Sequence, residues 1–190
     1  MSAIRTAAAI VVAASLLPAG LRASGRPDPP AGCQWKEIPE IKVHVALPDG
    51  WRFRRLPDKD DIMVWEVLPA GSGIPVLTQS RYELRFERLA RRDATVARAK
   101  QHVENAVAAA VESTPVEQEV IGDVTLFASV GQLMPDAAGV PQLIVAASAL
   151  ANSKTGALYT IRFEIAAGEA PAVLPLGNAL FRSIRVDDEM

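Results

Sequence analysis

Residues 81–89, Arg-Tyr-Glu-Leu-Arg-Phe-Glu-Arg-Leu, alternate between charged and apolar side chains along almost their whole length. Successive side chains of a strand point to opposite faces, so this period of two predicts a strand with one apolar and one charged face. In the residues that follow, apolar side chains recur with a different period. From Asp93 to Ser113 apolar residues recur every three or four positions, which predicts an amphipathic helix capped by Asp93 and stopped by Pro115.

On both sides of residues 81–113, the chain is predicted to consist mostly of strands. Turn residues bound them, as at Pro48-Asp49-Gly50, where proline presets φ and glycine accepts a positive φ. Gly122-Asp123 is a two-residue connection of the kind that closes a hairpin. A second helix is predicted over 169–181. The predicted strands are 41–47, 51–55, 62–68, 81–89, 116–121, 124–134, 142–152, 157–166 and 183–186.

Several of these strands, such as 143–151, are apolar on both faces. A sheet buried on both faces needs a cover on each side, and the two predicted helices supply the covers. The sequence therefore predicts a single α+β domain over 41–187, an antiparallel β-sheet sandwiched by helices. A charged tail, 188–190, follows it.

The N-terminus has the organisation of a secretory signal. A short positive region precedes an apolar run, Ala7–Leu17, of 11 residues, which is too short to span a bilayer. We expect residues 1–23 to be a signal peptide cut after Ala23, with cuts after Ala19 or Gly25 as alternatives. The protein would then be periplasmic or secreted, with no membrane span after cleavage.

Residues 24–40 are predicted to form a linker, because residues 24–34 are rich in proline and glycine and lack apolar periodicity. The single cysteine of the sequence, Cys33, lies there, so no internal disulfide can form. Cys33 follows Ala31-Gly32 as in a lipoprotein cleavage box, but Pro30 stands where leucine is usual. We expect a free thiol, and lipidation of Cys33 is the alternative.

Composition and charge exclude several classes of function. The chain is 49% hydrophobic and 22% charged, which is typical of a folded domain. Removing residues 1–23 takes away Arg5 and Arg22 and no acid, so the formal charge changes from −2 to −4. This mild acidity argues against nucleic-acid binding, which needs a basic surface. No dinucleotide, P-loop, zinc-protease or nucleophile-elbow motif occurs, so no cofactor, metal or catalytic residue is predicted.

Two parts of the chain resemble a known family. Residues 45–51, Val-Ala-Leu-Pro-Asp-Gly-Trp, resemble the opening strand and Pro-x-x-Trp turn of the Mog1/PsbP-like domains. The closing part is similar too: a long strand at 158–165, a helix at 169–181 and Arg-Ser-Ile-Arg-Val at 182–186. The resemblance covers residues 41–187 and implies the Mog1/PsbP-like α/β/α sandwich. It also implies an adaptor, assembly or lipoprotein module without a family-wide active site.

The histidines and acidic residues are the first candidates for catalytic or metal sites. His44 falls on the more polar face of its predicted strand, and His102 lies on the helix beside Val103. Neither has a neighbouring motif that would orient a catalytic base, so we interpret both as surface or packing residues. The run 58–61, Asp-Lys-Asp-Asp, lacks the glycine and distal glutamate of a calcium loop, and we interpret it as a solvated loop.

Aromatic and arginine side chains are the remaining candidates. The aromatics of the predicted strands favour a core over a ligand groove. They are Trp51, Phe53, Trp65, Tyr82 and Phe86. Arginine is enriched at protein interfaces, so the arginines in and after the central strand form a candidate interface. The alternative is a solvated face neutralised by Glu83 and Glu87. The candidate interface comprises Arg81, Arg85, Arg88, Arg91 and Arg92.

Taken together, the sequence predicts an exported, non-enzymatic binding or adaptor module of the cell envelope, with an unidentified envelope protein as its partner. Two alternatives stay open. One is a periplasmic small-molecule or lipid-binding protein that uses space between sheet and helix. The other is a hydrolase with an unrecognised site.

Overall fold

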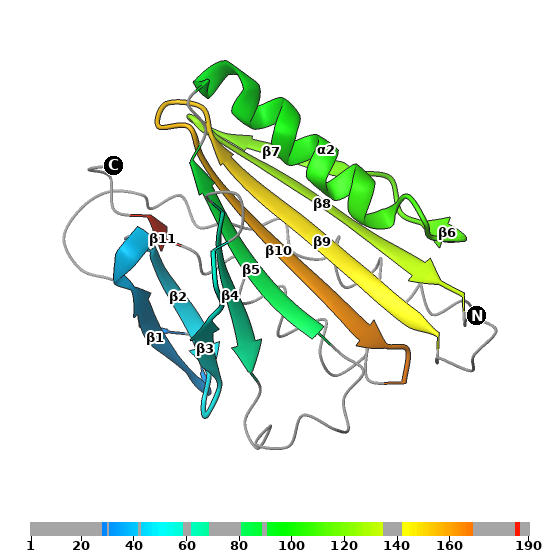
Figure 1. Cartoon of the computed structure of the whole chain (residues 1–190), viewed down its shortest axis with the longest axis horizontal. Helices are drawn as coiled ribbons and strands as arrows, with labels where there is room; N and C mark the ends of the chain where they lie inside the picture. The colour runs from blue at the N-terminus through cyan, green and yellow to red at the C-terminus, as the bar shows by residue number, and fades with distance from the viewer. Residues whose placement is uncertain are drawn as a thin grey trace.

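Two antiparallel sheets and one α-helix form the part of the chain that the computed structural model describes. That part comprises residues 28–29, 31–41, 43–58, 62–68, 81–88, 91–134, 142–168 and 185–186. The larger sheet has eight strands in the order β3-β4-β5-β10-β9-β8-β6, with β7 also paired to β8 (Figure 1). Its strands are β3 (Arg52–Arg55), β4 (Met63–Leu68), β5 (Arg81–Arg88), β6 (Glu112–Ser113), β7 (Glu117–Ile121), β8 (Val124–Leu133), β9 (Leu143–Asn152) and β10 (Ala157–Ala166).

Hairpin turns join β7 to β8 and β9 to β10. Gly122 has φ +59° between β7 and β8, and Gly156 has φ +79° between β9 and β10. Both values lie in the left-handed region that glycine adopts without a steric penalty. The other edge of β10 pairs with β5, with Thr160 opposite Arg85. This long-range pairing joins the N-terminal and C-terminal halves of the sheet.

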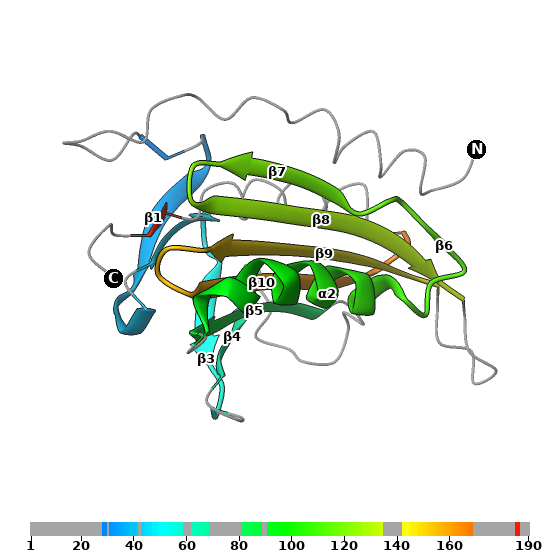
Figure 2. The ribbon, with the colours of Figure 1, turned by 90° about the horizontal axis from the view of Figure 1, so that it is seen from above.

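Helix α2 (Thr95–Val107) packs across β8, β9 and β10 on one face of the larger sheet (Figures 1 and 2). Its apolar stripe includes Ala99 and Val103, neither of which is exposed. They meet Phe127 of β8 and the small side chains of Ala147 and Ala149 on β9, which let the helix approach closely. Burial of each large side chain here, such as that of Phe127, contributes roughly 1.5–3 kcal/mol.

The helix is shorter than the sequence predicted. A 3-10 helix, η2 (Arg92–Ala94), precedes α2, and Asp93 pairs with Arg91 instead of capping the helix. The helix ends at Val107 and not at 113, because the following residues turn back to form β6 against β8. Their backbone groups form hydrogen bonds to the sheet. These bonds outweigh the preference for a helix that the continuing apolar periodicity indicates.

A second, three-stranded sheet covers the opposite face of the larger sheet. It consists of β1 (Cys33–Ile38), β2 (Val43–Pro48) and β11 (Arg185–Val186), with a 3-10 helix, η1 (Pro39–Ile41), between the first two. Val43, Val45 and Leu47 are fully buried against Trp65, Tyr159 and other large side chains of the eight-stranded sheet. Among the described residues, this face is therefore covered by strands and not by a helix.

The small sheet corrects two sequence predictions. Part of the predicted linker 24–40 forms β1, which pairs along its whole length with β2. Strand β2 is buried on both faces, so His44, expected on a polar face, is only 2% exposed. Both errors share one cause: the pairing partner of residues 33–38 is not visible in local periodicity.

Other predictions fall outside the described residues. These are the signal peptide at 1–23, the helix at 169–181 and the tail at 188–190. The antiparallel sheet and the central helix are confirmed.

Candidate functional site

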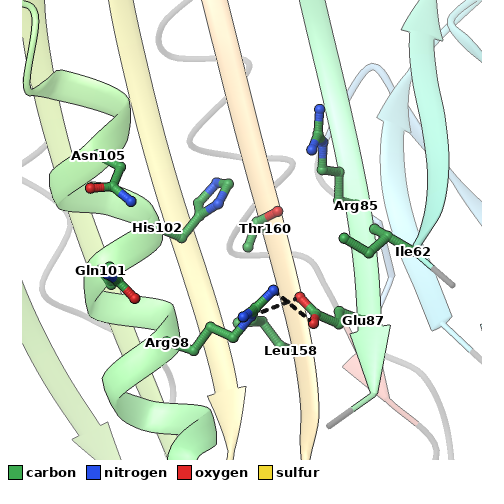
Figure 3. Close-up of a pocket in the computed structure, with 9 residues that line it drawn as sticks. All are labelled: Ile62, Arg85, Glu87, Arg98, Gln101, His102, Asn105, Leu158 and Thr160. Carbon is green, nitrogen blue, oxygen red and sulfur yellow. Dashed lines mark hydrogen bonds and ion pairs between the residues drawn. The ribbon is translucent and has the colours of Figure 1, made fainter. Parts of the chain in front are cut away.

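Beside α2, the larger sheet extends beyond the width of the helix. Because α2 packs on β8, β9 and β10, it leaves β5 and its neighbours β4 and β3 uncovered by other described elements on the same face. A groove of about 270 Å³ runs along this step between helix and sheet (Figure 3). Its helical wall consists of Arg98, Gln101, His102 and Asn105.

The sheet side of the groove is built by the alternation of β5. Leu84 and Phe86 point into the core, which turns Glu83, Arg85 and Glu87 toward the α2 face. Leu158 and Thr160 of β10 form the floor next to them. The charged face predicted for residues 81–89 is therefore the outer wall of the groove.

A row of charges crosses four strands on this face. Arg54 of β3 lies opposite Glu66 of β4, Glu66 lies opposite Glu83 of β5, and Glu83 lies opposite Arg162 of β10. Neighbouring strands are about 4.8 Å apart, so the two arginines stand about 14 Å apart at the level of the backbone. The row has two acidic residues in its middle and an arginine at each end.

Four ion pairs hold the side chains of the α2 face in place. Arg98 on α2 binds Glu87 with two bonds, Nε to Oε2 at 3.1 Å and Nη2 to Oε1 at 3.0 Å (Figure 3). Two parallel bonds fix the orientation of a guanidinium as well as its position. The four pairs are Arg54–Glu66, Arg85–Glu83, Arg98–Glu87 and Arg162–Glu164.

The pairs share one orientation with respect to solvent. The glutamate side chains are 18–26% exposed and the arginine side chains are 39–60% exposed. The carboxylates therefore lie inside and the guanidinium groups outside. A molecule that approaches this face would contact mainly N–H donors, although the four ion pairs together carry no net charge.

His102 projects from α2 over the floor of the groove (Figure 3). Burial, and then repulsion from Arg85, Arg162 and Arg98, lower its pKa from 6.5 to about 4, although Glu83 opposes the shift. The ring is therefore neutral at neutral pH. Its Nε2 is buried without a hydrogen-bond partner among the described residues. A neutral imidazole can accept a proton, but a pKa of about 4 makes this ring a weak base at neutral pH.

The comparisons with known proteins concern the fold. No protein-family model matches the sequence, and no curated protein matches it either. A solved structure of cyanobacterial PsbP (CyanoP) from Synechocystis sp. PCC 6803 superposes with a TM-score of 0.54 at 14% identity, over 88% of this chain and 99% of that one. A Mog1 point mutant superposes with a TM-score of 0.50 at 11% identity, over 83% and 97% of the two chains. The chain has a Mog1/PsbP-like fold.

A third solved structure, the Ran-binding protein Mog1p of Saccharomyces cerevisiae, gives a TM-score of 0.48 at 11% identity, over 81% of this chain and 95% of that one. At such identities the likeness concerns the fold alone. The resemblance that residues 45–51 and 158–186 suggested is confirmed at that level.

The arginines predicted as an interface are distributed over different parts of the Mog1/PsbP-like fold. Arg85 lies in the groove wall, whereas Arg88 alternates to the other face of β5 at the end of the strand. Arg91 pairs with Asp93 at 3.0 Å, and both are exposed. Arg92 is exposed in η2, and Arg81 opposes Glu164 of β10 in the backbone register.

The remaining candidates lie away from the groove. Cys33, at the start of β1, is a half-buried free thiol whose pKa is raised by burial and by Asp49, which reduces its thiolate fraction. Asp58 pairs with Arg55, while Asp60 and Asp61 lie outside the described residues. The described part of the chain holds no cluster of three potential metal ligands. No helix in that part combines the length and hydrophobicity needed to cross a membrane.

The sequence interpretation missed half of the groove. Arg98, Gln101 and Asn105 follow the helical period beside the apolar stripe, so a polar stripe was available as a signal. Thr160 and Arg162 carried no such signal. Thr160 joins the lining of the groove, and Arg162 joins the row of charges beside it, only because β10 pairs with β5.

Proposed function

We propose that the protein is an exported, non-enzymatic binding module of the cell envelope that holds a partner protein at the groove beside α2. The observation that carries this proposal is the state of the ionisable groups there. Glu83 and Glu87 are each held by an arginine, and His102 has a pKa of about 4. Acid–base chemistry is most efficient when the pKa of the group lies near the working pH, and that of His102 lies well below neutral pH. Recognition needs fixed donors, which the groove has.

The size and lining of the groove favour a protein partner over a small molecule or lipid. Small-molecule sites usually enclose roughly 300–1,000 Å³ and are mostly apolar. This groove measures about 270 Å³, and most of its described lining side chains are charged or amide-bearing. Leu158 and Ile62 are its aliphatic members, too few to hold an acyl chain.

The test is a crosslinking pull-down from the cell envelope with the full chain as bait. Two charge reversals on α2 provide a matched pair. Arg98 is 51% exposed and lines the groove, whereas Lys100 is 55% exposed and pairs with Glu104 outside it. We expect one stoichiometric partner that is captured by the wild type and by Lys100→Glu and is lost with Arg98→Glu.

Two results would contradict the proposal. The first is the absence of any enriched envelope protein with crosslinkers of different length. The second is a small molecule that co-purifies with the chain in native mass spectrometry, which would favour the small-molecule alternative. Charge reversal at Arg91 and Arg92 in the same experiment tests the interface predicted from the sequence.

A further inference from the structure

We propose that the groove beside α2, together with the row of charges next to it, binds an extended acidic segment of the partner protein with acidic side chains four positions apart; this inference rests on the proposed function. The starting observation is the common orientation of the four ion pairs on this face. In each of them the acid is the inner member and the arginine the outer one.

Among the described ion pairs, only those of this face have a largely buried acid, which is 18–26% exposed. In the pair Arg55–Asp58 the acid is the more exposed member, at 53% against 34%. Arg91–Asp93 and Lys100–Glu104 are exposed on both sides, at 80% and 70% and at 55% and 50%. The acid is slightly the less exposed member in two of these three pairs, but only on the α2 face is it the inner member of every pair.

An inner glutamate prepares an outer arginine for binding. A guanidinium carries five N–H donors in a planar fork, and a single carboxylate engages at most one edge of it. The free edge of Arg85 or Arg54 therefore faces solvent while the bound edge holds the side chain still. Side chains that are already ordered lose less entropy when a ligand binds. Such donors match carboxylates, which accept two parallel bonds.

The same arrangement disfavours a basic partner. A cation that approached Glu83 or Glu87 would have to displace Arg85 or Arg98, because each carboxylate lies behind its arginine. His102 is neutral and adds no charge, so the outermost charges around it are the guanidinium groups of Arg85, Arg162 and Arg98, with Glu83 behind Arg85. Charge complementarity therefore selects an acidic occupant.

The spacing of the row indicates an extended occupant. Arg54 and Arg162 end a row that spans three strand separations, about 14 Å. An extended peptide advances about 3.3 Å per residue, so residues i and i+4 of a segment lie about 13 Å apart. Side chains at i, i+2 and i+4 share one face of such a segment. Acidic residues at i and i+4 would lie over Arg54 and Arg162 at the two ends of the row, and an uncharged residue at i+2 would lie over Glu66 and Glu83.

The experiment measures binding of a fluorescein-labelled serine decapeptide with glutamate at every fourth position to the full chain by fluorescence anisotropy. A lysine–serine decapeptide of the same length is the control ligand. We expect the acidic probe to bind and the basic probe not to bind. Arg98→Gln is expected to weaken the acidic probe about fivefold, while Lys100→Gln, which removes the same charge from the same helix, leaves the affinity unchanged.

A third variant works in the opposite direction. Glu87→Gln removes a negative charge that lies behind Arg98, and we expect the lost repulsion to outweigh the lost ordering of Arg98, so the acidic probe should bind about fivefold more tightly. A circular-dichroism spectrum equal to that of the wild type separates this result from a loss of structure. Equal binding of both probes, equal losses in Arg98→Gln and Lys100→Gln, or weaker binding by Glu87→Gln would each overturn the inference.

The two proposals can fail separately. A partner captured from the envelope, combined with an acidic probe that does not bind, removes the acidic-segment inference and leaves the binding module. An acidic probe that binds with the expected variant pattern, combined with no captured partner, supports the groove as an acidic-ligand site and removes the envelope-adaptor proposal.

Discussion

Replacing His102 by glutamine is expected to make the stability of the protein less sensitive to acid. In the folded chain the pKa of His102 is lowered to about 4, first by burial and then by Arg85, Arg162 and Arg98. In the unfolded chain it has its ordinary value of 6.5. Between pH 6.5 and about 4, His102 binds a proton in the unfolded state but not in the folded state. The free energy of unfolding therefore falls as the pH falls.

The size of the effect follows from the width of this window. One pKa unit corresponds to about 1.4 kcal/mol, so a window from 6.5 to about 4 amounts to about 3 kcal/mol at full protonation. The stability that the neutral ring confers is fully present above pH 6.5 and is lost progressively down to about pH 4. Glutamine has a similar size and does not titrate, so His102→Gln lacks this loss.

The assay is urea unfolding of the wild type and His102→Gln at several pH values from 7.5 to 4. Comparison of the two proteins cancels the pH dependence that they share. We expect the difference in the free energy of unfolding, wild type minus variant, to fall by about 3 kcal/mol from the highest pH to the lowest. A difference that stays constant with pH would refute the placement of His102 among arginines beneath α2.

Three further predictions concern packing and export. Gly131→Ala is expected to destabilise the protein by about 1–3 kcal/mol in urea unfolding, because a Cβ there would lie 2.7 Å from the Cβ of Ala110. Phe127→Ala removes a side chain buried beneath α2 and is expected to cost about 3–5 kcal/mol by the same assay; a loss below about 1 kcal/mol would contradict the packing of helix on sheet. Intact mass of the protein recovered from a periplasmic fraction is expected to match a chain that begins at Ser24, and a mature chain that retains residues 7–17 would overturn the signal peptide.

Local patterns predicted most of the elements because they record burial of alternate or periodic side chains. The strand predicted at 157–166 has the same bounds in the structure, and the Gly122-Asp123 hairpin is present. The helix prediction failed at its C-terminal end, where apolar periodicity continues. There the backbone N–H of Val111 donates to the carbonyl of Gln132 at 3.0 Å, a bond to β8 that no local pattern encodes.

Strand β1 was missed for a related reason. Residues 33–38 have weak periodicity, and five of them are exposed or half-buried. Their strand conformation depends on the hydrogen bonds that β2 offers. The same pairing buries His44, which alternation alone had assigned to a polar face.

The sequence by itself determined that residues 81–89 would form a strand with one charged face, that an amphipathic helix would follow, and that the sheet would be antiparallel. It also carried the local likeness to Mog1/PsbP-like domains. Only the tertiary structure decided which charges meet: Arg98 reaches Glu87 because α2 lies beside β5, and Arg162 lies opposite Glu83 because β10 pairs with β5. Alternation and helical period are properties of neighbouring residues, whereas the order of strands in a sheet is set by pairings between distant segments. The groove, and the inner glutamates that orient its arginines, are products of that order.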